Sequence, residues 1–335
     1  MRTTVRFIIS SAVIFAILAV GAGIFLAEGA LHPGRRRLSA ADHSRGLQIA
    51  AQGNAAFDEV EITSADGIRL RGWNMRPLQN NGDAVILFHG LSDNRIGTIG
   101  YAELFLKHGY SVLMPDARAH GEREGELATY GLLEKKDIQR WSAWLESNEH
   151  PHCIFGFAES MGAAGLLQSL QSEGHFCAVI AESPFSNFRE IAYDRVGQFF
   201  RTGPWLGRTI LRPAVDVAFI HAKWKYKLNF EEVSPQNAVA ASRVPVFLIH
   251  GQIDGNIIIR HSRRIAAGNK SVILWEVPLA DHCRAIGVAP DELERRAVAW
   301  FQQHDVAVNE LSVTVLAKPE QQDAAPREQP AAARR

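Results

Sequence analysis

The sequence predicts an α/β fold with a mostly parallel sheet of about eight strands, preceded by a helix that spans a membrane. Three observations support this fold class: a long uncharged run near the N-terminus, a hairpin pattern that opens the main body, and a regular alternation of buried apolar runs with amphipathic segments between residues 57 and 303. Such alternation is typical of a parallel sheet with helices on both faces.

The uncharged run covers residues 7–27. As a helix it would be roughly 31 Å long, about the thickness of the hydrocarbon core of a bilayer. We therefore predict a retained single-pass anchor within residues 1–37, so that the protein is localised to a membrane. Basic residues flank the run on both sides, so their distribution selects no orientation. A cleaved signal peptide is the alternative, because small residues follow at Ala27, Gly29 and Ala30.

The segments on either side of the main body have biased compositions. Residues 38–56 are rich in Ala, Gly, Ser and Gln and predict a linker, whereas residues 305–335 are rich in Ala, Pro and Gln and predict a disordered tail. The body of the fold then covers residues 57–304. The chain has 36 basic and 36 acidic residues, which argues against a nucleic-acid binder.

The three cysteines are too few for a disulfide scaffold, and none has the spacing of a zinc site. Cys153 and Cys177 both begin predicted strands and could be neighbours. We expect buried free thiols, the usual state of isolated cysteines in an apolar core. No pattern in the sequence implies a metal or an organic cofactor.

Strands are predicted from periodicity. Alternating segments around residues 65–67 predict the opening antiparallel hairpin, and the continuous apolar runs that follow predict strands buried on both faces. Helical spacing of apolar residues lies between these runs. The predicted strands are residues 60–63, 68–75, 84–88, 111–114, 153–157, 177–181, 244–249 and 272–277.

One stretch, from residue 184 to about residue 241, is too long for a single crossover helix and predicts an inserted helical cap. It is rich in aromatic residues, and between residues 184 and 230 it has more basic than acidic residues. Such a surface could lie against an anionic leaflet. The alternative is a set of cap helices with a solvated charged face.

The sharpest local feature is a serine placed between a buried strand and a helix of small residues. Ser160 follows the run that ends at residue 157, and Ala158 and Gly162 stand two residues to either side of it. A serine on a tight strand-to-helix turn presents its hydroxyl at the edge of the sheet, beside the N-terminus of the new helix. The alternative role for Ser160 is that of a helix N-cap.

A serine nucleophile needs a base, and the base needs an acid that orients it. His282 lies just beyond the last predicted strand, and Asp254 lies just beyond the strand before it. Taken singly, His282 could be a surface loop residue and Asp254 an Asx-turn residue. Asp281 is a competing acid, but its adjacency to His282 places it badly to reach the ring. The chain order Ser160, Asp254, His282 therefore predicts a catalytic triad.

Two backbone amides are predicted to bind a developing oxyanion. The strand over residues 84–88 ends in His89-Gly90-Leu91, where the glycine lets the backbone turn and present the Leu91 amide. The second donor is the Met161 amide, at the start of the helix after Ser160. His89 itself is expected to be a hydrogen-bonded structural residue.

The chain resembles the α/β-hydrolase superfamily, and more closely bacterial membrane-anchored hydrolases related to the serine-aminopeptidase and dienelactone-hydrolase branches. The resemblance covers about residues 57–301 and implies Ser160, Asp254 and His282 as nucleophile, acid and base, with Leu91 and Met161 as oxyanion donors. Ala158 departs from the glycine usual at the first elbow position. The resemblance rests on residues 71–73, 89–90, 115–121, 129–131, 159–162, 183–185, 254 and 282.

These observations predict a serine hydrolase that cleaves a small-molecule ester, thioester or amide through an acyl-enzyme, with a carboxylesterase-type activity preferred. An acyltransferase or a peptidase using the same triad is the alternative among enzymes. A membrane-tethered binding protein that keeps only the fold is the alternative of another class. No nucleic-acid partner is expected.

Overall fold

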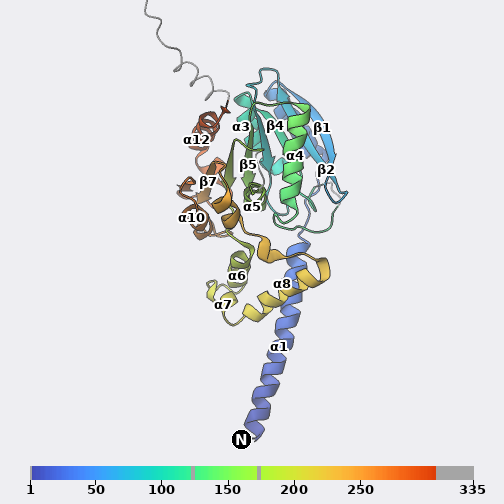
Figure 1. Cartoon of the computed structure of the whole chain (residues 1–335), viewed down its shortest axis with the longest axis vertical. Helices are drawn as coiled ribbons and strands as arrows, with labels where there is room; N and C mark the ends of the chain where they lie inside the picture. The colour runs from blue at the N-terminus through green and yellow to red at the C-terminus, as the bar shows by residue number, and fades with distance from the viewer. Residues whose placement is uncertain (1, 122–124, 172–174, 307–335) are drawn as a thin grey trace, which may run out of the picture.

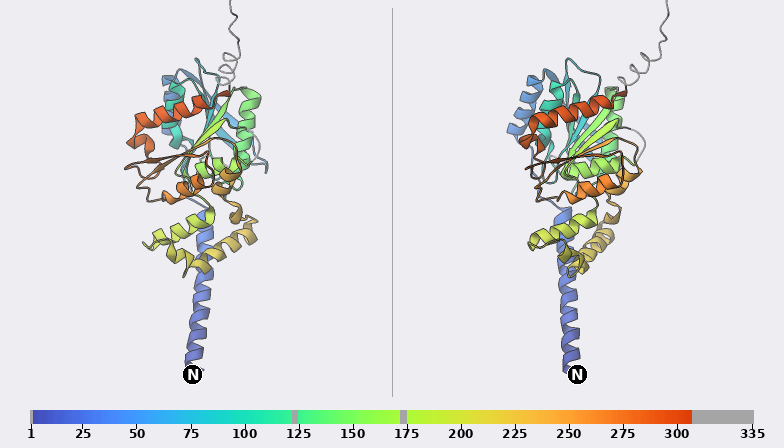
Figure 2. Two further views of the ribbon diagram at one scale, coloured as in Figure 1. Left: turned by 60° about the vertical axis from the view of Figure 1, so that its left-hand side comes forward. Right: turned by 90° about the vertical axis from the view of Figure 1, so that its left-hand side faces the viewer.

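Eight strands in the described part of the chain form one sheet (Figure 2). The structure, a computed structural model, describes residues 2–121, 125–171 and 175–306. Across the sheet the strand order is β1-β2-β4-β3-β5-β6-β7-β8; β1 and β4 each pair antiparallel with β2, and the other neighbours are parallel. The predicted fold class with its opening hairpin is confirmed. The strands are β1 (Ala55–Thr63), β2 (Arg69–Pro77), β3 (Ala84–Phe88), β4 (Ser111–Pro115), β5 (Ile154–Glu159), β6 (Ala178–Glu182), β7 (Val246–Gly251) and β8 (Ile273–Val277).

The side chains of the central strands alternate between two apolar layers. In β3, Val85 and Leu87 pack on one face of the sheet and Ile86 packs on the other, as the pleat of a strand requires. Helices α2 (Ala40–Gln52), α3 (Ile99–Lys107) and α12 (Pro290–Gln303) contribute to the first layer. The second layer is formed by α4 (Glu134–Asn148), α5 (Ser160–Ser169), α9 (Pro235–Ala241) and α10 (Arg260–Ala267). Short helical turns are η1 (Arg95–Thr98), η2 (Phe230–Glu232) and α11 (Ala285–Val288).

Residues 40–52 differ from the expected linker, because they form helix α2. Ser39 and Asp42 form a capping box at its N-terminus, which satisfies backbone donors that a helix would otherwise leave unpaired. Ile49 is buried, and Gly46 lies directly against the ring of Trp73. Contact with the sheet therefore orders this polar, Ala-rich segment. Of the tail expected over residues 305–335, residues 307–335 lie outside the described residues.

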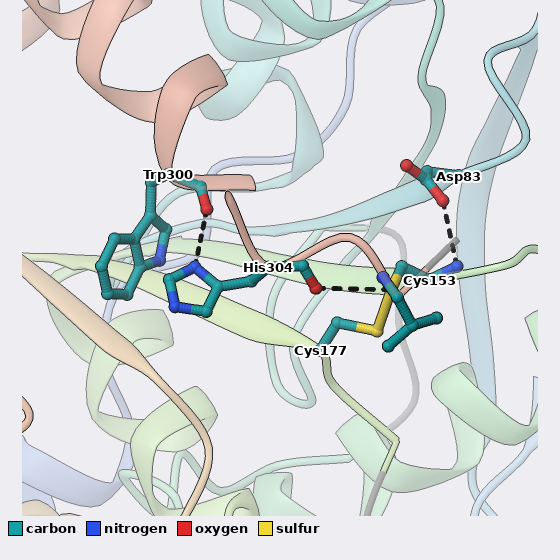
Figure 3. The surroundings of a disulfide bond; sticks show 6 residues. Asp83, Cys153, Cys177, Trp300 and His304 are labelled. Carbon is teal, nitrogen blue, oxygen red and sulfur yellow. Dashed lines mark hydrogen bonds between the residues drawn. A yellow bond between two sulfur atoms is a disulfide. The ribbon is translucent and has the colours of Figure 1, made fainter. Parts of the chain in front are cut away.

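Cys153 and Cys177 are joined in a disulfide, so the expectation of free thiols is wrong for this pair (Figure 3). The two residues immediately precede β5 and β6, which are neighbouring parallel strands, and their Cα atoms are 5.7 Å apart. The bond lies beside the end of α12, near Trp300 and His304 (Figure 3). Cys283 is the free cysteine among the described residues.

The long stretch between β6 and β7 forms a cap that stands apart from the sheet (Figure 1). Its helices are α6 (Phe188–Phe199), α7 (Trp205–Arg208) and α8 (Arg212–Tyr226). Helix α9 lies within the range expected for the cap but packs against α5 and α10 beside the sheet, so the cap ends earlier than expected. Helix α1 (Arg2–Leu31) runs from the sheet domain past the cap and packs against α8 (Figure 1).

Candidate active site

The turn between β5 and α5 places Ser160 in a strained backbone conformation. Its φ angle is 51°, in the left-handed region that residues with a Cβ seldom adopt. Gly162 makes this tight turn possible, because a Cβ there would lie 2.5 Å from the carbonyl oxygen of His89. Ala158 is fully buried in β5, whose extended backbone accepts a Cβ. The departure from glycine at this position therefore leaves the turn intact.

The structure brings the three predicted triad residues into one hydrogen-bonded chain. The Oγ of Ser160 is 2.9 Å from Nε2 of His282, and Nδ1 of His282 is 2.8 Å from Oδ2 of Asp254. They come from the segments that follow β5, β7 and β8, at the carboxyl ends of parallel strands. This is the edge of an open α/β sheet where ligands bind. The arrangement can pass a proton from the serine hydroxyl to the imidazole.

The Asp254 carboxylate is held in an ionised and oriented state. Burial opposes its ionisation, but hydrogen bonds from His250 and His282 outweigh burial and lower the pKa of Asp254 below its ordinary value. The backbone N–H groups of Asn256 and Ile257 donate to its second oxygen, Oδ1, at 2.9 and 2.8 Å. Sequence reasoning missed His250, although its position at the end of an apolar strand, four residues before Asp254, is a readable signal.

Asp281, the competing acid, connects two loops through backbone hydrogen bonds. Its Oδ1 accepts hydrogen bonds from the backbone N–H groups of His282 and Gly255 at 2.8 and 3.1 Å. It therefore ties the loop that holds His282 to the loop that holds Asp254. The ring of His282 is hydrogen bonded to Asp254 instead.

A cavity of about 700 Å³ opens over Ser160 and His282. Gly90, Leu91 and Met161 also line it, so the two residues whose amides are the predicted oxyanion donors lie at the cavity. A Cβ on Gly90 would lie 3.3 Å from the Cβ of Ser160, which shows how closely this backbone approaches the serine. The remaining wall is largely apolar and comes from α1 and the cap.

The carboxyl groups of half-buried Glu159 and buried Glu182 are linked to each other and to the loop that carries His282. The Tyr101 hydroxyl is 3.0 Å from Oε1 of Glu159 and 2.8 Å from Oε2 of Glu182, which are paired residues of β5 and β6. Burial and then the neighbouring carboxylate raise the pKa of Glu159 well above its ordinary value. Glu182 also accepts from the backbone N–H of Ala285 at 3.0 Å, and so holds the loop that carries His282. Sequence reasoning missed Tyr101 and Glu182.

Two further serine–histidine–aspartate chains occur among the described residues, and the burial of their serines separates them from the cavity. Ser186 Oγ is 2.9 Å from Nδ1 of His261, whose Nε2 is 2.7 Å from Asp194. Ser262 Oγ is 2.7 Å from Nδ1 of His250, whose Nε2 is 3.4 Å from Oδ2 of Asp254. Ser186, His261 and Ser262 are fully buried and do not line the cavity. Ser160 and His282 are thus distinguished by access to the cavity.

Other candidate side chains have structural partners. Burial, as the largest cause, lowers the pKa of His89 to about 4, and its neutral ring accepts from the Ala117 N–H at 2.9 Å. Burial raises the pKa of the Cys283 thiol well above its ordinary value, so Cys283 is a poor nucleophile. In the described ranges, Asp83, Cys153 and Asp305 lie close enough to share a metal ion. The sulfur of Cys153 is in the disulfide, so no thiolate completes that group.

Comparisons with known proteins agree with this architecture. No family model matches the chain. It is 28% identical over 221 residues to an uncharacterised Bacillus subtilis protein, YqkD, covering 63% of this chain and 69% of that one. The Pyrococcus furiosus esterase Pf2001 superposes with a TM-score of 0.62 at 25% identity, covering 82% of this chain and 97% of the esterase.

A Pyrococcus horikoshii acylaminoacyl peptidase superposes with a TM-score of 0.58 at 18% identity, covering 78% of this chain and 43% of the peptidase. That likeness concerns the fold alone. Together with the sheet order, the strained serine turn and the segments at the carboxyl edge of the sheet, these findings place the chain in the α/β-hydrolase superfamily.

Proposed function

We propose that this chain is a membrane-anchored serine hydrolase that cleaves a carboxylic ester. The observation that carries the proposal is the hydrogen-bonded chain from Ser160 through His282 to Asp254, whose serine end opens into a largely apolar cavity. The fold and its esterase neighbour support hydrolase activity in general. The geometry supports the serine mechanism, because a candidate nucleophile, a candidate base and a candidate orienting acid lie within hydrogen-bond distance of one another.

The proposed reaction proceeds through an acyl-enzyme. Ser160 Oγ attacks the ester carbonyl carbon while His282 Nε2 takes the hydroxyl proton, and Asp254 steadies the imidazolium through Nδ1. The Leu91 and Met161 amides donate to the oxyanion. The intermediate collapses as His282 delivers its proton to the departing alcohol. Water, deprotonated by His282, then attacks the acyl-enzyme, and His282 returns this proton to Ser160 Oγ as the bond to the acyl carbon breaks and the carboxylic acid leaves.

The anchor proposed here is retained rather than cleaved. Glu28, near the end of α1, accepts hydrogen bonds from His221, Lys225 and Tyr226 of α8, each at 2.7 Å. The carbonyl of Ala30 accepts from the Tyr130 hydroxyl at 2.8 Å. Cleavage after Ala30 would remove the contacts that Glu28 and Ala30 make with α8 and Tyr130. Almost none of the apolar part of α1 is buried in protein, as expected for a segment that lies in lipid.

Labelling with a fluorophosphonate probe tests the serine assignment. We expect covalent labelling of the wild-type chain and none of Ser160→Ala. Ser186→Ala is the matched control, because Ser186 has the same kind of histidine–aspartate partners without access to the cavity, and it should label like the wild type. An unlabelled wild-type chain, or labelling that persists in Ser160→Ala, would overturn the proposed function.

A further inference from the structure

The cavity over the catalytic serine has a wall made by the end of α1. The cavity that Ser160 and His282 line is also lined by Phe25, Leu26, Ala27, Gly29, Ala30 and Leu31. Phe25 is 77% exposed and yet lines the cavity, so the cavity reaches the protein surface at that residue. Phe25 belongs to the uncharged run of residues 7–27. The cavity thus opens beside a part of the chain whose composition matches the interior of a bilayer.

The start of α8, in the cap, lies beside the uncharged run of α1. Gly23 is buried, and a Cβ on it would lie 2.5 Å from the carbonyl oxygen of Ala214 and 2.6 Å from Val217, both in α8. Gly23 precedes the end of the uncharged run by four residues, or about 6 Å along a helix. The first turns of α8 therefore lie about 6 Å inside the level at which the run ends. If α1 spans a bilayer, this part of the cap is immersed in it.

The outer surface of the cap suits that position. Large apolar side chains stand exposed on it, with Phe199 at 81% and Trp224 at 74% exposure. Exposed arginines and lysines lie among them, which is the pairing of aromatic and basic groups that interfacial segments use against anionic lipid. The exposed apolar side chains of the cap are Phe199, Phe200, Trp205, Ile210, Ile220 and Trp224.

The interior of the cavity suits a hydrocarbon chain. Phe185, Phe188, Phe219 and Phe230 line it together with aliphatic residues, and its volume of about 700 Å³ is that of a site for a whole small molecule. An acyl chain buried there would gain about 0.8 kcal/mol for each methylene removed from water. Ser160 and His282 line the same cavity, where Ser160 would meet the carbonyl carbon of that chain.

We propose that the substrate is a long-chain acyl ester of a bilayer lipid, which enters the cavity from the leaflet beside Phe25. The proposal rests on the serine hydrolase function above and names its substrate class. The reaction is hydrolysis of the acyl ester at Ser160, which releases a fatty acid and leaves the alcohol portion of the lipid. The cap and α1 then form an entrance for the acyl chain as well as an attachment to the membrane.

The test compares two glycines of α1. A Cβ on Gly29 or on Gly21 would meet no atom within 4 Å, but Gly29 lines the cavity and Gly21 does not. The full-length chain, reconstituted in phosphatidylcholine–phosphatidylglycerol vesicles, is assayed with p-nitrophenyl palmitate in the vesicles and with p-nitrophenyl butyrate in the water. Gly29→Trp should lower the ratio of palmitate to butyrate turnover at least tenfold. Gly21→Trp should leave that ratio within twofold of the wild-type value.

A second pair of variants tests entry from the leaflet. Trp224→Glu places a charge on the cap surface and should lower turnover of vesicle-borne palmitate about fivefold. Leu78→Glu, at a residue that is 76% exposed outside the cap, should not change it.

Turnover that is insensitive to Trp224→Glu, or an unchanged chain-length ratio in Gly29→Trp, would overturn the proposal. A wild-type chain that hydrolyses butyrate but not vesicle-borne palmitate would contradict the lipid substrate alone, whereas a chain that hydrolyses neither and resists the fluorophosphonate would contradict the serine hydrolase function.

Discussion

The carboxyl edge of the sheet and the cap both line the cavity, but different interactions organise the two regions. At the sheet edge, Ser160, His282 and Asp254 are joined by hydrogen bonds of 2.8 to 2.9 Å, and backbone amides fix the acid from the other side. In the cap, the cavity wall is apolar and is joined to α1 chiefly through packing and the contacts of Glu28. Directional bonds set the positions of reacting atoms, whereas apolar packing sets shape and volume. Changes at the sheet edge should therefore alter rate, and changes in the cap should alter substrate preference and attachment.

The largest effect is expected at Asp254. Asp254→Asn retains the size of the side chain but cannot hold His282 in the tautomer that accepts the serine proton, and we expect turnover to fall by about 10³–10⁴-fold. Asp281→Asn is the matched control, because its remaining oxygen can still accept from the two loop amides, and it should keep turnover within a few-fold of the wild type. Steady-state kinetics on p-nitrophenyl butyrate measure both. Similar losses in the two variants would contradict the assignment of Asp254 as the acid.

A smaller effect is expected where α1 meets the cap. Glu28→Ala leaves His221, Lys225 and Tyr226 without their shared acceptor, and we expect hydrolysis of vesicle-borne palmitate to fall about fivefold, equivalent to roughly 1 kcal/mol. Glu292→Ala is the control. Its carboxylate is similarly exposed, 36% against 32%, and bonds two arginines on α12, far from the cap.

The wild-type chain used for this comparison should show an intact mass that includes residues 1–31. A shorter chain with full activity would contradict the retained anchor.

The smallest effect is expected at the amino ends of the parallel strands. A substitution there should change the stability of the protein, but neither its rate nor its substrate preference. Asp83 precedes β3, and burial followed by the charge of Asp305 raises its pKa to about 6. Because a raised carboxyl pKa makes the folded state bind the proton more tightly, this group costs stability as the pH rises from about 4 through 6. Asp83→Asn removes the charge and should stabilise the protein at pH 8 by on the order of 1 kcal/mol.

This gain from Asp83→Asn should be much smaller at pH 4, where the wild-type carboxyl is protonated in the folded protein and partly protonated in the unfolded chain. Thermal unfolding followed at pH 4 and pH 8 measures the difference. A variant that is equally stabilised at both pH values would show that the charge of Asp83 is not the cause.

Some of the site can be read from local sequence. Ser160 is recognisable because a strained strand-to-helix turn needs small neighbours, and Asp254 and His282 because each follows an apolar strand. The three meet because parallel strands end at one edge of the sheet, whatever their exact register. His250, Tyr101 and Glu182 escaped this reasoning, since their contacts depend on which strands are neighbours and on the pairing of Glu159 with Glu182.

The sequence by itself determined the alternation of strands and helices, the uncharged N-terminal run and the order of the proposed triad, because each of these is a local pattern of side-chain polarity. Only the tertiary structure decided that Cys153 and Cys177 pair, that residues 40–52 form a packed helix, and that α1 lines the cavity over Ser160. These features join segments distant along the chain. Their free energy comes from contacts that exist only once the sheet, the cap and α1 have come together.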